Sequence, residues 1–382
     1  MKFKKQFTFI AFILIVVIIW TLLWNRITTN NTVLLAKFNR DFLNTHDTKQ
    51  ITERMVMSTP KAPNEIVISV VSCGMRLQET LNMLKSALMF NVDKVALKFI
   101  IVTETSSIAS FREKLEDWLV LTKNEFTFEI LPLTFPEKHK NEWKNLFKPC
   151  AAQRLFLPSL LSHIDSVLYV DTDTLFLTPV SDIWHFFTEF NSSQIAGLSP
   201  EHEDRNVGWY NRFAKHPFYG PMGLNSGVML MNLTRMRKFK WEEYILPLYK
   251  EFKLKITWGD QDLINILFYY HPDKLYLFPC EWNYRPDHCM YMPVCKATTG
   301  VKILHGNRGY FHADKQPIFS TTFRIVQEYR LGDDLYNNFL MTLESALADS
   351  TVVQSNCGKV SDKLLIKSRE LFKEVEYYYN TR

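Results

Sequence analysis

The chain has 382 residues, of which 47% are hydrophobic and 14% aromatic, so it can bury a large core and is not an intrinsically disordered protein. Its formal net charge at pH 7 is only +5, and its lysines and arginines are scattered without a zinc-finger or helix-turn-helix pattern, which excludes nucleic acid as an expected partner. The length fits one large α/β domain or two ordinary domains.

The first predicted element is a membrane-spanning helix over residues 7–24, an uncharged apolar run that is long enough to cross a bilayer. Three lysines precede the run and a single arginine, Arg26, follows it closely, which favours a cytoplasmic amino end at residues 1–6. The run is rich in branched residues and no small-x-small cleavage site follows it, so a signal anchor is favoured and a cleaved signal peptide is the alternative. We therefore expect a single-pass type II protein of the ER or Golgi membrane, with the rest of the chain in the lumen.

A stem is predicted between the anchor and the folded part of the chain. Residues 25–63 are polar and end in a proline-containing segment, so we assign the folded lumenal domain to residues 64–382. Sequons at Asn30 and Asn191 are expected glycosylation sites, whereas a third at Asn232 follows an apolar run and is expected to lie too near the core.

The folded domain is predicted to alternate strands and helices. Runs of β-branched and aromatic residues predict strands at 66–71, 97–103, 126–131, 167–170, 194–198, 225–232 and 301–304. Apolar residues at helical spacing predict helices at 79–88, 111–121, 151–162, 242–252 and 260–269, and a largely helical tail over 319–347 and 363–379. Such alternation predicts one α/β domain with a mostly parallel sheet covered by helices on both faces.

Three polar segments directly follow predicted strands: Cys73-Gly74, Asp171-Thr172-Asp173 and His305-Gly306. In open α/β sheets, ligands bind at the carboxyl ends of the strands. We therefore expect these three segments to converge on one crevice.

The Asp-x-Asp triplet is a candidate metal site. Asp171 and Asp173 point the same way in an extended segment, and burying two unpaired carboxylates in an apolar stretch is costly without a cation. Magnesium and manganese both accept carboxylate and diphosphate oxygens, and a third ligand from the imidazole of His305 favours manganese. A helix cap or Asx-turn is the alternative for the aspartates, and a structural histidine is the alternative for His305.

Other polar positions support an anion site. Gly306 and Gly309 allow a close backbone approach to a phosphate, and Arg308 or Lys315 is a candidate for holding diphosphate oxygens. Three weaker candidates each have an ordinary structural alternative. The segment Asp260-Gln261-Asp262 could cap a helix, and Asn225-Ser226-Gly227 could contain a glycine with only a structural role in a strand. Arg154 could be a solvated arginine.

The chain has six cysteines, three of which fall within the run Cys280–Cys295. In an oxidising lumen at least one disulfide is expected there, and Cys289–Cys295 is the closest pair, although spacing does not determine connectivity. A zinc site that combines His288 with the three cysteines is the alternative.

These pieces together resemble glycosyltransferase family 8, a retaining family that includes glycogenin and bacterial lipopolysaccharide galactosyltransferases. The resemblance covers about residues 65–315 and rests on Val70-Val71-Ser72-Cys73, Lys85-Ser86, Arg154-Leu155, Leu168–Asp173, Asn225–Val228, Asp260-Gln261-Asp262 and His305-Gly306. Within the family, the chain most resembles the glucoside xylosyltransferases, through Cys73–Leu77, Gly223–Asn232, Pro279–Cys289 and His305–Gly309. The resemblance implies a GT-A type fold and transfer of xylose from UDP-xylose, in α1,3 linkage, to glucose O-linked on EGF-like repeats such as those of Notch.

The resemblance also implies roles for individual residues. It assigns manganese, or else magnesium, to Asp171, Asp173 and His305. It assigns nucleotide binding to Cys73, Gly74, Arg76 and Thr172, and donor-sugar or diphosphate contacts to Arg154, Asn225, Gly306, Arg308 and Lys315. It assigns catalysis to Asp260 and Gln261. The family's His-x-x-Gly-x-x-Lys-Pro pattern is not matched, because Lys315 comes too late, so the choice between Arg308 and Lys315 stays open.

The implied reaction is a front-face displacement, because the sequence offers no obvious carboxylate nucleophile for a double displacement. Two alternatives remain: another family 8 activity, such as xyloside xylosyltransferase or a different donor sugar, and a lumenal binding protein without turnover. The aromatic stretch 209–213 and the loop 280–295 are candidates for receiving an EGF-like acceptor, with packing of the domain edge as the alternative.

Overall fold

The computed structural model describes residues 65–380, except 124, 138–139, 145 and 147–149. The predicted cytoplasmic tail, membrane anchor and stem, and the sequon at Asn30, lie outside these residues. Among the helices that are described, none is both long and apolar enough to span a membrane. Asn191 is described and exposed.

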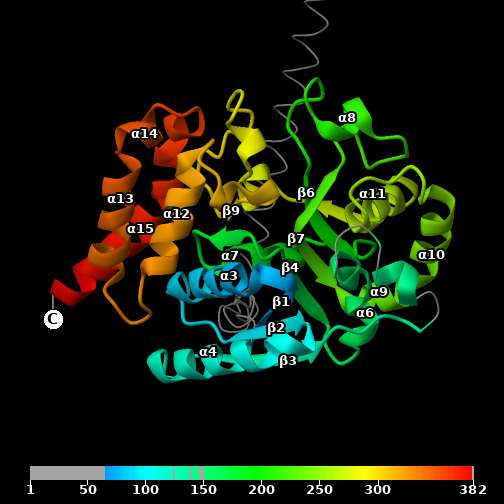
Figure 1. Cartoon of the computed structure of the whole chain (residues 1–382), viewed down its shortest axis with the longest axis horizontal. Coiled ribbons are helices and arrows are strands. Elements are labelled where there is room, and N and C mark those ends of the chain that lie inside the picture. The colour runs from blue at the N-terminus through cyan, green and yellow to red at the C-terminus, as the bar shows by residue number, and fades with distance from the viewer. Residues whose placement is uncertain (1–64, 124, 138–139, 145, 147–149, 381–382) are drawn as a thin grey trace, which may run out of the picture. The chain divides into compact units, whose positions relative to one another are not determined.

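A seven-stranded sheet forms the centre of the described domain (Figure 1). Its strand order is β3-β2-β1-β4-β7-β6-β8. The strands are β1 (Ile66–Ser72), β2 (Leu97–Thr103), β3 (Phe126–Pro132), β4 (Ser166–Val170), β6 (Ala196–Pro200), β7 (Leu224–Asn232) and β8 (Leu275–Leu277). A separate two-stranded sheet pairs β5 (Thr174–Phe176) with β9 (Ile303–His305).

The sheet is mostly parallel, as the sequence predicts, with β7 as the exception. β7 runs antiparallel to both of its neighbours, β4 and β6. The amino end of β7, with Asn225, therefore lies at the same edge of the sheet as the carboxyl ends of the parallel strands. This reversal brings a strand start and several strand ends to one place.

Helices cover both faces of the sheet, because successive strand residues point to opposite sides. Ile66, Ile68 and Val70 of β1 share a buried cluster with α3 (Leu77–Met89) and α4 (Ile108–Leu121). Val67 belongs instead to the cluster on the other face, which includes side chains from α6 (Leu157–Leu160), α9 (Leu233–Phe239), α10 (Trp241–Phe252) and α11 (Asp260–Tyr270). Three short helices complete this part of the chain: α5 (Lys140–Lys144), α7 (Val180–Trp184) and α8 (Trp209–Phe213).

The carboxyl-terminal tail is helical, as predicted, and has its own buried cluster. Its helices are α12 (Pro317–Glu328), α13 (Met341–Leu347), α14 (Ser350–Val353) and α15 (Ser361–Asn380), drawn in orange and red in Figure 1. Lys85 of α3 donates to the carbonyl oxygens of Val326, Gln327 and Tyr329 at 2.7–3.0 Å and so fastens the end of α12 to the sheet-covering helix.

The predicted helix at 151–162 is confirmed over 151–160, but it is not one continuous α-helix. The segment is a 3-10 helix over Ala151–Phe156, followed by the single turn of α6. Pro158 sits in the first turn of α6 and lacks the amide proton that a continuous helix would use. The tighter helix turns Arg154 inward, where its side chain is only 7% exposed.

All six cysteines form disulfides, which pair Cys73 with Cys150, Cys280 with Cys295, and Cys289 with Cys357. The expectation of a disulfide within Cys280–Cys295 is confirmed, but the pair Cys289–Cys295 is wrong. Cys357 comes from the helical tail, and sequence spacing carries no signal for that tertiary contact. The zinc alternative is also wrong, because no thiolate remains to ligate a metal.

Candidate functional site

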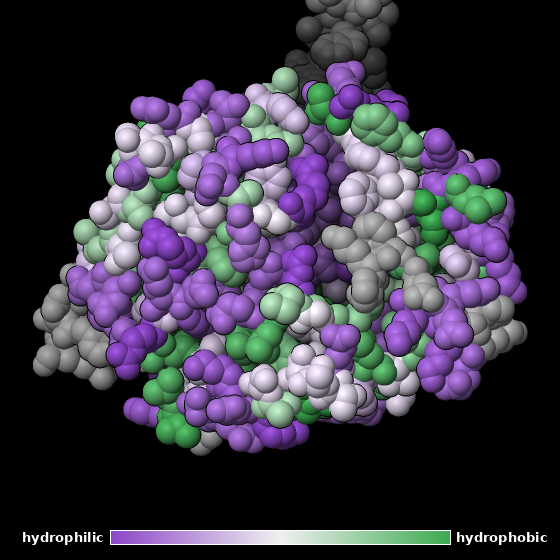
Figure 2. Space-filling view, in the orientation of Figure 1, coloured by the Kyte–Doolittle hydropathy of each residue, from purple (hydrophilic) through white to green (hydrophobic). Residues whose placement is uncertain are grey.

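A cavity of about 490 Å³ opens at the edge of the sheet where the parallel strands end. Figure 2 shows this face hollowed by a deep groove with a hydrophilic interior. The cavity is lined by most of the sequence-predicted site residues: Cys73, Gly74, Arg76, Arg154, Asp171, Thr172, Asp173, Asn225, Asp260, Gln261, His305 and Arg308. Gly306 and Lys315 are not among the residues that line it.

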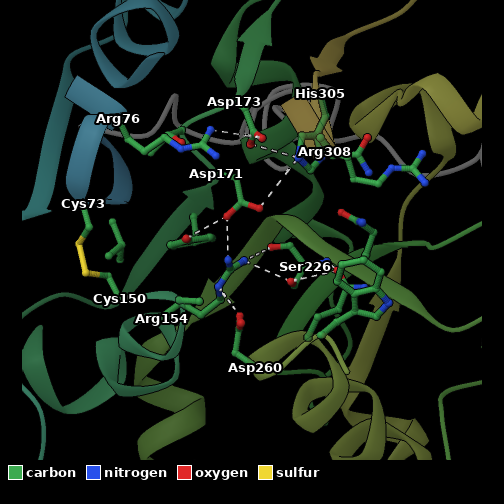
Figure 3. A pocket seen from close by; sticks show the side chains of 18 of the residues that line it. Cys73, Arg76, Cys150, Arg154, Asp171, Asp173, Ser226, Asp260, His305 and Arg308 are labelled. Atoms are coloured by element: carbon green, nitrogen blue, oxygen red, sulfur yellow. Dashed lines mark hydrogen bonds and ion pairs between the residues drawn. A yellow bond between two sulfur atoms is a disulfide. The ribbon is translucent and has the colours of Figure 1, made fainter. Parts of the chain in front are cut away.

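Asp171, Asp173 and His305 meet in this cavity (Figure 3). β4 ends at Val170, and the pairing of β5 with β9 sets Thr174 opposite His305. The potential ligand atoms of the three side chains all lie within 4.8 Å of one another, and His305 Nε2 lies 3.3 Å from Asp173 Oδ1. Two carboxylates and one imidazole at these distances fit a manganese or magnesium ion.

The hydrogen bonds of His305 leave one ring nitrogen for a metal. Its Nδ1 lies 2.8 Å from Asn283 Oδ1, while the Asn283 amide nitrogen donates to Asn225 Oδ1 at 2.9 Å. The oxygen of Asn283 therefore faces the ring, so Nδ1 carries the proton and the lone pair of Nε2 points toward the aspartates. Such outer partners commonly fix the tautomer of a metal-binding histidine.

The space around Gly227 explains why the Asn225-Ser226-Gly227 segment contains a glycine. A Cβ atom at this position would lie 2.2 Å from His305 Cε1. The Gly227 amide also donates to Asn225 Oδ1 at 3.0 Å, and its carbonyl oxygen accepts from the Asp171 amide at 2.8 Å. The small residue lets β7 pass directly beneath the imidazole.

The charge environment keeps Asp173 ionised. Burial raises the pKa of its carboxyl, but the hydrogen bond with His305 and the nearby Arg76 guanidinium outweigh burial, so the net pKa is lowered. Arg76 Nη1 lies 4.0 Å from Asp173 Oδ2 and also forms a short ion pair with Glu79. Arg76 thus lies next to the candidate metal site, and the family resemblance assigns it to nucleotide binding.

Arg154 occupies the centre of the cavity floor and is not solvated. It contacts Asp171 at 2.8 Å and Asp260 at 2.6 Å, donates to the carbonyl oxygen of Ser226 at 2.6 Å, and stacks 4.4 Å from the centre of the Tyr169 ring (Figure 3). Burial alone would lower the pKa of the guanidinium, but the two aspartates outweigh burial and raise it. A buried, permanently charged arginine therefore joins both candidate aspartate groups.

The structure separates the roles of the two aspartates that open α11. Asp262 accepts the backbone amides of Thr257 and Trp258 at 2.6 and 2.7 Å, so the capping interpretation applies to it. Asp260 instead turns toward Arg154, and burial raises the pKa of its carboxyl to about 6, partly offset by Arg154. The Gln261 amide oxygen accepts the Ser226 amide at 3.0 Å, which fixes the side chain against the cavity wall.

The nucleotide-side residues gather around the first strand end. Gly74 has a φ of +61° and donates its amide to Glu104 at 2.8 Å, a conformation that favours glycine. Cys73 is bonded to Cys150, and both line the cavity. The Thr172 hydroxyl donates to buried Glu79 at 3.2 Å.

Of the two basic candidates for a diphosphate, Arg308 lines the cavity and Lys315 is exposed outside it. Arg308 has a φ of 58° and contacts Asp287 at 2.5 Å. Gly306 serves packing, because a Cβ atom there would lie 2.4 Å from Phe311 Cγ.

Sequence reasoning missed several cavity or supporting residues, above all Asn283, Glu79 and Glu201. Each becomes important only through a partner far along the chain, so spacing carries no signal for it. A polar residue within an otherwise apolar segment, such as Asn283 between Trp282 and Tyr284, is the one cue that was available.

The chain is similar to known proteins in sequence and in fold. The chain matches the family described as Glycosyl transferase family 8 over residues 37–305. It is 49% identical over 337 residues to glucoside xylosyltransferase 2 of Xenopus laevis, covering 85% of this chain and 78% of the relative. It is 48% identical over 325 residues to glucoside xylosyltransferase 1 of Homo sapiens, covering 82% of this chain and 72% of the relative. The solved structure of the galactosyltransferase LgtC in complex with donor and acceptor sugar analogs has the same fold, with a TM-score of 0.53 at 16% identity, covering 72% of this chain and 100% of that one.

Proposed function

The chain belongs to glycosyltransferase family 8, and from that premise we propose that it moves xylose from UDP-xylose, in α1,3 linkage, to glucose O-linked on EGF-like repeats. The observation that carries the proposal is the convergence of Asp171, Asp173 and His305 in the cavity of a chain about half identical to enzymes named glucoside xylosyltransferases.

The donor set fits a manganese or magnesium ion, since it combines two carboxylates with an imidazole nitrogen whose tautomer is fixed. Asp171, Asp173 and His305 would hold the ion. When bound, it supplies positive charge that neutralises a departing diphosphate.

The remaining residues would hold and orient the donor. Arg308, from the loop after β9, is our candidate for binding diphosphate oxygens, because it lines the cavity and Lys315 does not. Cys73, Gly74, Arg76 and Thr172 would hold the nucleotide. Arg154, Asn225 and Asp260 would hold the sugar and its phosphate, with Arg154 fixed by its contacts to Asp171 and Asp260.

A front-face displacement is the route that this arrangement supports. Asp260, a carboxylate near the sugar position, is engaged by Arg154 and is poorly placed to act as a covalent nucleophile. Gln261 would lie beside the anomeric carbon, where its amide dipole, held by Ser226, stabilises developing positive charge. The bond between the anomeric carbon and the diphosphate oxygen would break while the acceptor hydroxyl attacks from the same face, and the hydroxyl proton would pass to the departing diphosphate.

A lumenal site for this reaction is supported by the cysteines. Three disulfides are typical of proteins that fold in an oxidising compartment, as a type II protein of the ER or Golgi would. EGF-like acceptors would approach through exposed side chains such as Phe213 of α8 and Tyr291 of the 280–295 loop, which are 51% and 75% exposed.

Mass spectrometry of an O-glucosylated EGF-like repeat, incubated with the protein, manganese and UDP-xylose, tests the proposal. The expected product carries one added pentose, and the Asp173→Ala protein should form it at least about a hundredfold more slowly. Transfer of a different sugar from a panel of UDP-sugars, or full activity in Asp173→Ala, would contradict the assignment.

A further inference from the structure

Glu201 lies at the end of β6, at the same edge of the sheet as the candidate metal site, and it lines the cavity. β7 separates β6 from β4, and along β7 the Glu201 amide bonds to Gly223 whereas the Asp171 amide bonds to Gly227. At about 4.8 Å per strand and about 3.4 Å per residue, the two backbones lie roughly 16 Å apart at the sheet edge. The distance leaves space for a sugar between the candidate metal and this carboxylate.

The carboxylate of Glu201 lacks a full set of partners. Its Oε2 atom is buried and has no hydrogen-bond partner among the described residues. The backbone amide of Trp209 donates a hydrogen bond to the carboxylate. A buried carboxylate with an unused oxygen is costly, and a hydroxyl-bearing ligand would remove that cost.

The two nearby arginines, Arg285 and Arg308, are engaged by other partners. Arg285 is fully buried, but its Nη2 atom is used by the main-chain oxygens of Pro200 and Glu201. Arg308 is held by Asp287. Burial raises the pKa of the Glu201 carboxyl to about 7, with Asp287 adding to the rise and Arg285, Arg308 and the Trp209 amide opposing it.

Two tryptophans form an aromatic wall beside this carboxylate. Trp209 and Trp258 both line the cavity, and their rings lie 5.5 Å apart at 69°. Each is only partly buried, so each keeps some accessible surface in the cavity lining. An aromatic ring can pack against the C–H groups on one face of a pyranose, while a buried acceptor beside it can take a hydrogen bond from one of the hydroxyls.

We propose that Glu201, Trp209 and Trp258 form the subsite for the acceptor sugar, in which a pyranose stacks on the tryptophans and gives a hydroxyl hydrogen bond to Glu201. That the sugar is glucose rests on the proposed function. Glu201 acts here as a positioning and specificity residue, because it holds a hydroxyl other than the one that attacks.

Saturation-transfer NMR tests this subsite without requiring turnover. The full chain, loaded with UDP and Mg²⁺ because manganese is paramagnetic, is titrated with a methyl D-glucoside, used as each anomer in turn. Glu201→Gln and Trp209→Ala should each weaken glucoside binding roughly tenfold to a hundredfold, while the Kd for UDP stays within about twofold of the parent value. Glu203→Gln, which changes an exposed carboxylate outside the cavity, should bind like the parent.

Parent-like glucoside binding by Glu201→Gln, or no binding of either anomer by the parent, would overturn the subsite. Glu201→Gln is close to isosteric, and its melting temperature checks that a loss of binding is not a loss of folding. Glucoside binding that depends on Glu201, without transfer of xylose, would support the subsite and contradict the proposed function. Xylose transfer by Glu201→Gln with the parent KM for the glucoside would contradict the subsite alone.

Discussion

Single polar side chains set the chemistry of the cavity through the partners that they hold. His305 presents one nitrogen to Asp173 because Asn283 occupies the other, and Asn283 is in turn oriented by Asn225. The candidate metal site therefore depends on Asn283 and Asn225, two side chains from other segments of the chain that would not contact the ion themselves.

Replacing Asn283 with alanine tests this dependence. Without the amide oxygen, His305 can rotate or take the other tautomer, so the affinity for manganese should fall roughly tenfold to a hundredfold. Isothermal titration calorimetry with MnCl₂ in the presence of UDP measures the change. Asn338→Ala, at an exposed position of the tail, is the matched control, and equal affinities for the two variants would refute the supporting role.

The buried carboxyl of Glu201 predicts a pH dependence of stability. Burial raises its pKa from 4.5 to about 7, so the folded state binds this proton more tightly than the unfolded state. Its contribution to stability is complete below pH 4.5 and is lost as the pH rises through about 7.

Glutamine mimics the protonated form of Glu201 at every pH. Glu201→Gln should therefore match the parent near pH 4.5 and be more stable by up to about 3 kcal/mol above about pH 8. Urea unfolding at a series of pH values measures this, and a difference that does not change with pH would argue against the shifted pKa.

At the scale of elements, strand direction and helix attachment decide which residues meet. The reversal of β7 carries Asn225 and Gly227 to the edge where β4 and β6 end, and the β5–β9 pair brings His305 to Asp173. The tail is attached by a different device, the Lys85 ammonium at the end of α12.

Lys85→Met should therefore destabilise the domain. The substitution keeps the length of the side chain but leaves three helix-end carbonyl groups without their charged donor, at a cost of about 2 kcal/mol. Lys250→Met, at an exposed position of α10, should change the unfolding free energy little. The measurement is chemical denaturation, and similar losses in both variants would show that Lys85 is not an anchor.

At the scale of the whole molecule, the sequence predicted most strands, the helical tail and the convergence of three strand-end segments. The strands and helices follow from local hydrophobic periodicity. The convergence of segments such as Asp171–Asp173 follows from the rule that ligands bind at the carboxyl ends of parallel strands. The sequence did not predict the direction of β7, the contacts of Arg154 with Asp171 and Asp260, or the pairing of Cys289 with Cys357. Each of these depends on which distant segment packs against it, and a single sequence does not contain that information.

The Cys73–Cys150 disulfide has a practical consequence for obtaining the protein. It joins two wall segments of the cavity that are 77 residues apart, the first next to Gly74 and the second next to the helix that carries Arg154. A chain synthesised in a reducing bacterial cytosol would lack this covalent link and would fold with a loosened pocket. Preparations from a periplasmic or secretory host are therefore the appropriate material for any assay, and a thiol reductant in the storage buffer is best avoided.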